Sequence, residues 1–533
     1  MPIKVIDLFA GCGGIGEGFA AAGSDSERVF EIELSVESDK NACDTLRLRK
    51  FFWEFEIPPD AYYQYVRGEI DKEQMIALHP EEWARAQGKV LCEELGDNEF
   101  TDVMLPKLIE QRIGDAEDWI LVGGPPCQAY SAAGVARNRG KKNYSAEKDG
   151  RHFLYKQYLK IIGEFAPPMF LMENVPGILS SKVGGERIFP KILEDLENPV
   201  ASLGLSDSHR LVCPGYRIFS VAKPSQFDMF HSIANKHSDF IVKSEEYGVP
   251  QSRHRVFLLG VRLGLEGMPE TLEKRDQRFG VKSSVCDLPR IRSALSVEDR
   301  VDKWVGALGS IPDTGWFKSL RVSSRREGLT DAIEEHCRSL VAPRAGIGSR
   351  FVKSGVVSPK ILKDWIGDAR LGGACNHESR AHMESDLHRY MFASTEMAFR
   401  EADASPIGTA QPAALRISEF PSELLPNHEN VKGKNDLKLV SFSDRFKVQR
   451  ANAPASTIVS HIAKDGHYFI HYDPSQCRSL TVREAARLQT FPDNFFFEGS
   501  RGAGYKQVGN AVPPYLAMQI AELVSNYFSA QKS

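Results

Sequence analysis

The chain opens on a strand-forming segment that runs directly into a turn rich in glycine. Apolar residues dominate positions 3–9, four glycines follow within positions 11–16, and a helix-forming stretch then ends at Gly23. A strand, a tight turn and a helix in this order are typical of a parallel α/β sheet. Further apolar runs at 29–34, 119–122 and 169–172 end in polar, glycine or proline residues. The sequence therefore predicts an α/β domain whose ligands lie at the carboxyl ends of its strands.

Length, charge and cysteine usage limit the class of protein. The 533 residues, 42% of them hydrophobic, suffice for two or more structural units with stable cores. The formal net charge of -4 excludes a polybasic protein, so any site for a polyanion has to be local. No apolar run reaches about 18 residues and no secretion signal opens the chain, which predicts a cytoplasmic protein without a membrane span. The nine cysteines include no CxxC pair, which disfavours a disulfide framework or a zinc ribbon.

Changes in sequence pattern suggest the domain organisation. Aromatic and charged residues between 49 and 96 indicate a helical insertion. From 261 to about 440 the alternation of strands and helices fades, and proline, glycine and basic residues become frequent. The alternation returns with a helix expected at 481–489, where Thr481 and Glu484 form a capping box. We therefore predict one domain assembled from 1–261 and 441–533, interrupted by a smaller domain at 262–440.

The glycine turn and an acidic residue form the first candidate site. Glycines between a strand and a helix let a ligand approach the backbone beside a helix N-terminus. Glu37 ends the second predicted strand, where a carboxylate can accept hydrogen bonds from ribose hydroxyls. A tight turn beside a surface glutamate is the alternative interpretation, and this pair of features alone does not decide between them.

Three later segments carry residues with catalytic chemistry. Two prolines stiffen the loop that presents Cys127, whose thiol can act as a nucleophile. Glu173 follows the next apolar strand, so its carboxyl group should lie at the same edge of the sheet and can act as an acid if buried. Gln251, Arg253 and Arg255 project to one face of a further strand. The alternatives are an inert buried cysteine, an exposed strand-end glutamate and a charged edge strand.

Together these segments resemble the DNA cytosine-5 methyltransferase family, whose motifs they match in order. The matching blocks are DLFAGCGG at 7–14, PPCQ at 125–128, ENV at 173–175, QSRHR at 251–255, LTVREAARLQ at 480–489 and QVGNAVPP at 507–514. The largest gap lies where the family places its target recognition region. The resemblance implies a Rossmann-like, S-adenosyl-methionine-dependent methyltransferase sheet made from 1–261 and 441–533, with a smaller target recognition domain inserted at 262–440.

The resemblance also implies a mechanism. The target cytosine is flipped out of the duplex because its ring carbons cannot be attacked within the base stack. Cys127 would add to C6, Glu173 would bond to N3 and the exocyclic amine, and Arg253 would orient the base or its phosphate, with Arg255 as the second candidate. C5 then takes a methyl group from S-adenosyl-methionine, and loss of the C5 proton with expulsion of the cysteine restores the ring.

The cofactor residues carry over from the same family pattern. The residues expected to bind S-adenosyl-methionine are Phe9, Gly11, Gly14, Glu37, Asp97, Pro126 and Asn510. Among them, Glu37 would hold the ribose, and Asp97 is the nearest candidate for a contact to the adenine amine. Pro125 departs from the pattern, since many members carry a bulkier residue beside the adenine.

Basic residues gather in the predicted recognition domain, and no acidic residue interrupts 338–363. The residues predicted to contact DNA phosphates are Arg338, Arg344, Arg350 and Lys353, with a solvated surface as the alternative. A group of one cysteine and three histidines at 375–388 fits no common zinc-finger spacing, so no metal is predicted.

Two other functions share parts of this pattern. A tRNA cytosine methyltransferase of the similar eukaryotic-type subfamily has the same motifs, but it has a small recognition region and a Cys-Phe-Thr signature that this chain lacks. A catalytically silent DNA-binding adaptor would have lost the nucleophile or the cofactor loop, and both are present. The expected partner is double-stranded DNA, bound by a monomer. A restriction-modification system with a cognate endonuclease, a phage-defence system and a solitary methylase remain open as biological settings.

Overall fold

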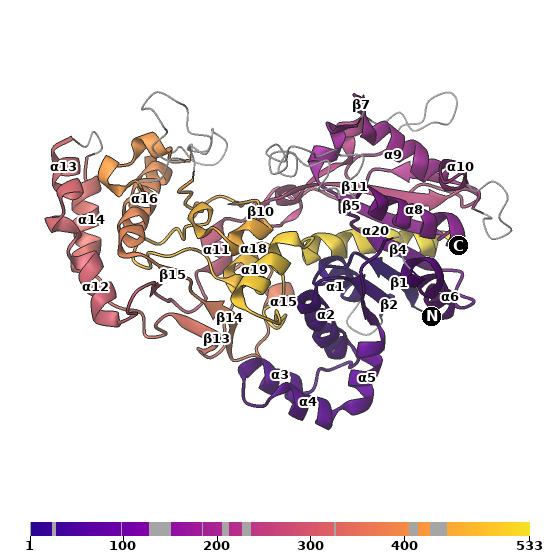
Figure 1. Cartoon of the computed structure of the whole chain (residues 1–533), viewed down its shortest axis with the longest axis horizontal. Coiled ribbons are helices and arrows are strands. Elements are labelled where there is room, and N and C mark those ends of the chain that lie inside the picture. Colours follow the sequence, from indigo (N-terminus) through magenta and orange to yellow (C-terminus); the bar gives the residue numbers. More distant parts are fainter. Residues whose placement is uncertain are drawn as a thin grey trace. The chain divides into compact units, whose positions relative to one another are not determined.

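The computed structural model describes residues 2–23, 28–96, 99–126, 151–183, 185–204, 213–225, 236–323, 327–403, 414–426 and 445–532. By its contacts the chain forms two compact units (Figure 1). Unit 1 comprises Met1–Pro59, Ile76–Gln277 and Ala511–Ser533, and unit 2 comprises Asp60–Met75 and Arg278–Asn510. Part of the predicted insertion and the block at 480–489 therefore group with unit 2.

A mixed sheet forms the centre of unit 1. Its strands are ordered β3-β2-β1-β4-β5-β11-β8, and β9 also pairs with β11. The strands span Ile3–Leu8 (β1), Phe30–Glu37 (β2), Val90–Cys92 (β3), Trp119–Gly123 (β4), Met169–Asn174 (β5), Tyr216–Phe219 (β8), Ile241–Lys243 (β9) and His254–Arg262 (β11). The first five are mutually parallel, which confirms the predicted α/β fold, whereas β11 runs antiparallel to its neighbours.

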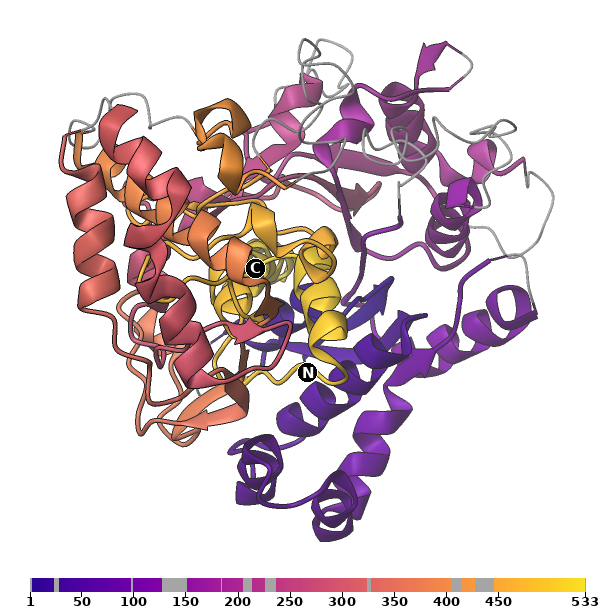
Figure 2. The same cartoon turned by 60° about the vertical axis from the view of Figure 1, so that its left-hand side comes forward.

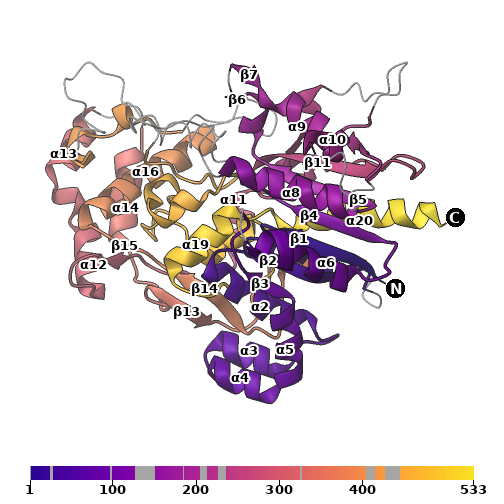
Figure 3. The same cartoon turned by 45° about the vertical axis from the view of Figure 1, so that its right-hand side comes forward.

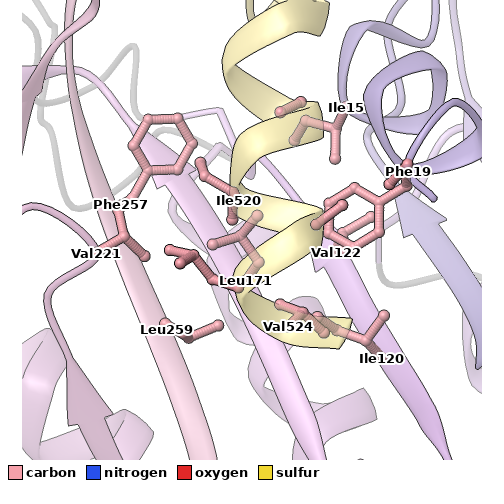
Figure 4. Packing of buried hydrophobic residues seen from close by; sticks show 14 of the residues in the cluster. Ile15, Phe19, Ile120, Val122, Leu171, Val221, Phe257, Leu259, Ile520 and Val524 are labelled. Carbon is pink, nitrogen blue, oxygen red and sulfur yellow. The ribbon is translucent and has the colours of Figure 1, made fainter. Parts of the chain in front are cut away.

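Helices α1 (Gly14–Ala20) and α20 (Pro514–Gln531) cover one face of this sheet. Figure 4 shows Ile520 and Val524 of α20 among side chains of the strands, such as Val122 and Leu171. The two helices approach closely because Gly18 has no side chain: a Cβ atom there would lie 2.5 Å from the Cβ of Ala517. The C-terminal helix thus completes the core that begins with the first strand.

The second face of the sheet is covered by helices α6 (Leu105–Ile113), α8 (Arg151–Phe165) and α9 (Ile188–Glu197) (Figure 3). At the edge of the sheet formed by β3, α2 (Lys40–Trp53) and α5 (Pro80–Gly88) pack against each other and against that strand. The α2 helix begins where the Asp39 side chain accepts hydrogen bonds from the amides of Asn41 and Ala42. Between 49 and 96 the chain is mostly helical, as predicted, but β3 within that stretch belongs to the central sheet.

Unit 2 consists of helices and short two-stranded pairs (Figure 2). Its helices include α3 (Asp60–Arg67), α12 (Val301–Gly309), α13 (Gly315–Ser323), α14 (Leu329–Arg338), α16 (Glu384–Asp403), α18 (Val482–Leu488) and α19 (Arg501–Asn510), and its longest strand pair is β13 (Gly348–Lys353) with β14 (Gly373–Glu378). The N-cap of α18 is Thr481, with the predicted capping box to Glu484 in place.

Buried charges tie α18 to its surroundings in unit 2. Arg478 contacts Glu484 at 2.6 Å, and Arg487 contacts Asp493 and Asp287 at 2.7 Å each. Burial alone would raise the pKa of Glu484, but Arg478 holds that pKa far below its usual range. Because each charge is paired, removal of one partner would leave the other buried and uncompensated.

Two buried histidines make the stability of unit 2 depend on pH. Burial lowers the pKa of His377 and of His471 to about 4, against an ordinary value of 6.5. Between these values the unfolded chain binds protons that the folded chain does not, so stability is lost as pH falls from about 6.5 towards 4. Each histidine should contribute up to about 1.4 kcal/mol per pH unit to that loss.

This pH effect can be measured by urea unfolding at pH 7, 6 and 5. We expect His377→Gln to flatten the decline in unfolding free energy relative to the unsubstituted protein. The matched control is His461→Gln, at an exposed histidine of the same unit, which should leave the slope unchanged. An equal slope for His377→Gln and the unsubstituted protein would contradict the assignment.

Candidate active site

The carboxyl ends of β1, β2, β4 and β5 meet at one edge of the sheet in unit 1. The first strand leads into the glycine turn at 9–13, β2 ends at Glu37, β4 leads into 124–126, and β5 ends with Glu173 and Asn174. The order β3-β2-β1-β4-β5 places a topological switch between β1 and β4, which is where open sheets bind ligands. The sheet thus brings the predicted cofactor and catalytic residues of these strands to one edge.

Glu37 closes the glycine turn through its carboxylate. Its Oε2 atom accepts a hydrogen bond from the Gly11 amide at 2.8 Å, and Oε1 accepts from the amides of Ser38 and Asp39 at 2.9 and 2.7 Å. These bonds fix the carboxylate at the end of β2. Because each oxygen has more than one acceptor position, Glu37 can also bind the hydroxyl groups of a ribose.

The backbone of the turn leaves room for a ligand. Gly11 has a φ of 58°, and among the described residues no heavy atom beyond its chain neighbours lies within 4 Å of the position that a Cβ atom would take there. Gly14 is instead packed tightly, since its Cβ would lie 2.3 Å from the Val512 carbonyl oxygen. Phe9 also has a positive φ of 60°, a strained conformation that is typical of ligand sites. An open, glycine-lined space beside a fixed carboxylate fits a nucleoside cofactor.

An ion pair holds the predicted acid at the end of β5. The Arg255 Nε atom lies 2.8 Å from Oε1 of Glu173, and both side chains are largely buried, at 11% and 15% exposed. The second oxygen, Oε2, lies 2.9 Å from the position that a Cβ atom would take at Gly124, so a side chain there would collide with the carboxylate. Arg253 is fully buried nearby in sequence, and burial followed by repulsion from Arg255 lowers its pKa. Arg255 therefore makes the direct contact with the acid.

Asn174 holds the loop that leads to the predicted nucleophile. Its Nδ2 atom donates to the Pro125 carbonyl oxygen at 3.3 Å, and its Oδ1 atom accepts from the Val175 amide at 2.9 Å. The side chain is 4% exposed. Asn174 belongs to the ENV block at 173–175, but its contact joins residues 49 positions apart and cannot be predicted from that block alone.

Comparisons with known proteins agree with this geometry. The family model for C-5 cytosine-specific DNA methylases matches residues 3–58, 95–199 and 396–526. The Type II methyltransferase M.Bpa9945I of Bacillus paralicheniformis is 31% identical over 98% of this chain and 98% of its own length. The chain belongs to the C-5 cytosine-specific DNA methylase family. As a DNA (cytosine-5-)-methyltransferase, it uses S-adenosyl-methionine as its methyl donor, as predicted.

Other relatives extend the comparison. The Type II methyltransferase M.AgeI of Thalassovita gelatinovora is 26% identical over 98% of this methylase and 99% of its own length. Among solved structures, a protein encoded within an E. coli prophage and described as a DNA modification methyltransferase covers 99% of both chains, with 20% identity and a TM-score of 0.50. This likeness shows the fold. In the described part of the methylase, no helix is long and apolar enough to cross a membrane.

Four further residues of the methylase were predicted to act in catalysis or cofactor binding. Cys127 and Asp97 lie outside the described residues. Pro126 is half-buried after β4 in unit 1, and Asn510 ends α19 in unit 2. Their roles stay predictions.

All four predicted DNA contacts are exposed residues of unit 2. Arg338 is on α14, where Glu334 and Glu335 each lie 3.1 Å from its guanidinium group. Arg344 follows that helix, and Lys353 ends β13. The acidic neighbours of Arg338 would compete with a phosphate, so Arg344 and Lys353 are the better candidates for DNA contact.

Arg350 is held by aromatic rings. Its guanidinium group lies 4.7 Å from the ring centroid of Tyr65 and 4.5 Å from that of Phe496, and it donates to the Tyr65 carbonyl oxygen at 3.3 Å. These contacts attach α3 of the insertion to β13 within unit 2. A structural role thus accompanies the predicted contact of Arg350 with DNA.

The residues considered for zinc, Cys375, His377, His382 and His388, bond to separate protein groups. The Nε2 atom of His388, for example, lies 2.9 Å from the Ala307 carbonyl oxygen. These contacts give each residue a structural role in unit 2.

The geometry predicts a specific loss of cofactor affinity when Glu37 is replaced. Glu37→Ala removes the carboxylate that accepts from the Gly11 amide and that we expect to bind the ribose, so the KM for S-adenosyl-methionine should rise about tenfold or more. The control is Glu31→Ala in the same strand, where the side chain pairs with Lys89 at 3.2 Å. An unchanged KM in Glu37→Ala would show that the ribose lies elsewhere.

Proposed function

We propose that this methylase modifies cytosine within a specific sequence of double-stranded DNA through a covalent bond between Cys127 and C6 of a flipped base. One observation carries the proposal: Arg255 fixes the Glu173 carboxylate against Gly124, at the start of the loop that leads to Cys127. A carboxyl group held at this place could meet the polar edge of a base that the Cys127 thiol attacks.

Each residue of the arrangement has a distinct task. Cys127 forms the bond to C6, while Glu173 holds the exocyclic amine and shares a proton with N3 as negative charge develops there. Arg255 orients Glu173 through its ion pair, and Asn174 keeps the prolines before Cys127 in place. Arg253 contributes a second positive charge for the base or its phosphate.

The cofactor site serves the same reaction. Phe9, Gly11, Gly14 and Glu37 would hold S-adenosyl-methionine, together with Pro126 and Asn510. When bound, S-adenosyl-methionine supplies the methyl group that C5 accepts. Loss of the C5 proton then lets the bond between Cys127 and C6 break, with the electron pair returning to the cysteine sulfur.

The names of the relatives support a biological setting. M.Bpa9945I and M.AgeI are both Type II methyltransferases, and each aligns with this chain over nearly its whole length. We propose that this methylase likewise acts as a monomer in a restriction-modification system and protects host DNA from a cognate endonuclease in the cytoplasm.

Base-resolution mapping tests the proposed substrate. Purified protein, labelled S-adenosyl-methionine and genomic DNA lacking cytosine methylation should give 5-methylcytosine at one recurring short motif, and total tRNA should stay unlabelled. Label in tRNA alone would favour the RNA enzyme. Label spread over cytosines in all sequence contexts would contradict sequence-specific recognition.

A further inference from the structure

Helix α3 of the insertion packs against β13 of the predicted recognition domain, and both belong to unit 2 (Figure 1). Neither segment falls within the residues that the family model matches, which are 3–58, 95–199 and 396–526. Members of one family share their chemistry, so the segments outside the shared pattern are where a member can differ in what it recognises. Residues that determine the target sequence are therefore expected where α3 meets β13.

Three buried tyrosines fix α3 within unit 2. Tyr62, Tyr63 and Tyr65 are at most 5% exposed. Each hydroxyl donates a hydrogen bond to a residue far away in sequence: Tyr62 to the Asn494 carbonyl oxygen at 2.6 Å, Tyr63 to Oδ2 of Asp368 at 2.7 Å and Tyr65 to Oε1 of Glu498 at 2.6 Å. Because a buried hydroxyl without a partner is costly, these bonds hold the helix in one position.

Tyr65 and Phe496 hold the guanidinium group of Arg350, a residue of β13. The two rings meet at 71° with their centroids 6.1 Å apart, and the guanidinium carbon lies within 4.7 Å of both centroids. Nη2 of Arg350 also donates to the Tyr65 carbonyl oxygen. Contacts with rings and a hydrogen bond restrict the orientation of a planar guanidinium, so less rotamer entropy is lost when it binds a partner.

Arg350 is exposed and keeps N–H donors for a partner. Its bond to Tyr65 uses one of several guanidinium N–H groups, and in the described part of the chain it forms no ion pair. Three other cations around α3 are already paired with carboxylates: Arg67 with Glu69 at 2.8 Å, Arg370 with Asp60 at 2.7 Å and Lys72 with Glu498 at 3.4 Å. Arg350 thus offers an oriented and uncompensated positive charge.

An arginine with a fixed guanidinium plane suits two hydrogen-bond acceptors that lie side by side. In the major groove of DNA, guanine is the base that presents two acceptors, N7 and O6, and arginine is the side chain that most often binds both. A phosphate also presents neighbouring oxygens, but every nucleotide carries one, so a fixed orientation brings no sequence selectivity there. The restricted orientation of Arg350 therefore favours a base contact over the phosphate contact expected from the sequence.

We propose that Arg350 recognises a guanine of the target sequence and that Tyr65 is the positioning residue that orients it. The inference rests on the proposed function, since it requires a specific sequence in double-stranded DNA. Arg350 donates two hydrogen bonds to N7 and O6 of the base, while Tyr65 and Phe496 hold the guanidinium plane. The insertion between β2 and β3 thereby takes part in target recognition through α3.

Substitution of Arg350 tests the base contact. The methylation rate, as kcat/KM, is measured on duplexes that carry the mapped motif or a single base-pair change at one of its positions. We expect the unsubstituted protein to prefer a guanine at one position by about tenfold or more, and Arg350→Ala to lose that preference while keeping the preferences at the other positions. The control is Arg344→Ala, predicted to contact a phosphate, which should lower the rate on all duplexes by a common factor.

Variants of Tyr65 test the positioning. Tyr65→Ala removes the ring and should lose the same preference, whereas Tyr65→Phe keeps the ring and should retain it. Adding Tyr65→Ala to Arg350→Ala should cause no further loss of preference, because Tyr65 acts through Arg350. Since Arg350 is exposed, Arg350→Ala decides the base contact even where Tyr65→Ala lowers stability.

Two results would overturn the inference while leaving the proposed function intact. Equal effects of Arg350→Ala on all duplexes, or no effect, would show that Arg350 does not recognise a base. Full preference for the guanine in Tyr65→Ala would show that α3 does not orient Arg350. Absence of any preferred motif for the unsubstituted protein would instead contradict the proposed function, and this inference with it.

Discussion

Cys127→Ser is expected to lower methyl transfer to DNA by about 1,000-fold or more. A serine hydroxyl keeps its proton at neutral pH and is a far weaker nucleophile towards C6 than a cysteine thiolate, so the covalent step fails. Binding of S-adenosyl-methionine should be retained, because the turn at 9–13 and Glu37 are unchanged.

The control for this substitution is Cys213→Ser, at a free cysteine of unit 1, which should keep its activity. Methyl transfer is measured with labelled cofactor, and cofactor binding by calorimetry. Full turnover in Cys127→Ser would show that Cys127 is not the nucleophile. Loss of cofactor binding in the same variant would indicate a damaged fold rather than a missing nucleophile.

Glu173→Gln is expected to reduce kcat by about 100-fold with little change in the KM for the cofactor. An amide cannot share a proton with N3, so the charge that develops on the ring is no longer neutralised. The substitution also leaves Arg255 without its ion-pair partner, which should lower stability as well.

A second variant distinguishes the effect of losing the ion pair from the effect of losing the acid. Arg255→Lys keeps a positive charge beside Glu173 but loses the planar guanidinium group, so it should retain more activity than Glu173→Gln. Glu117→Gln, at an exposed position before β4, is the control for the change from acid to amide. A Glu173→Gln variant with near-normal kcat would contradict the role of the acid.

The sequence was most informative where local patterns determine structure. The run at 3–9, the glycine turn and the helix after it are found as β1, the turn and α1, and the capping box predicted at Thr481 begins α18. Glu37 and Glu173 both end parallel strands, so their placement at one edge of the sheet follows from the fold class alone.

Contacts between distant segments could not be predicted. The stacking of Arg350 on Tyr65 joins residues 285 positions apart, and the bond from Asn174 to Pro125 depends on how two loops pack. The pairing of Asp7 in β1 with Ser35 in β2 could not be predicted either. A register shift after Val5 in the pair of β1 and β2 brings Ser35 beside Asp7, and simple alternation along the strands does not show such a shift.

Covalent trapping on duplex DNA is the sharpest test of the bond between Cys127 and C6. In duplex DNA containing 5-fluorocytosine, C5 has no proton to lose, so the bond between Cys127 and C6 should persist once methyl transfer has occurred. We expect a denaturation-resistant complex that forms only with S-adenosyl-methionine, with the modified base attached to the peptide containing Cys127. Efficient 5-methylcytosine formation on ordinary DNA without any trapped complex, or a base attached to another residue, would contradict it.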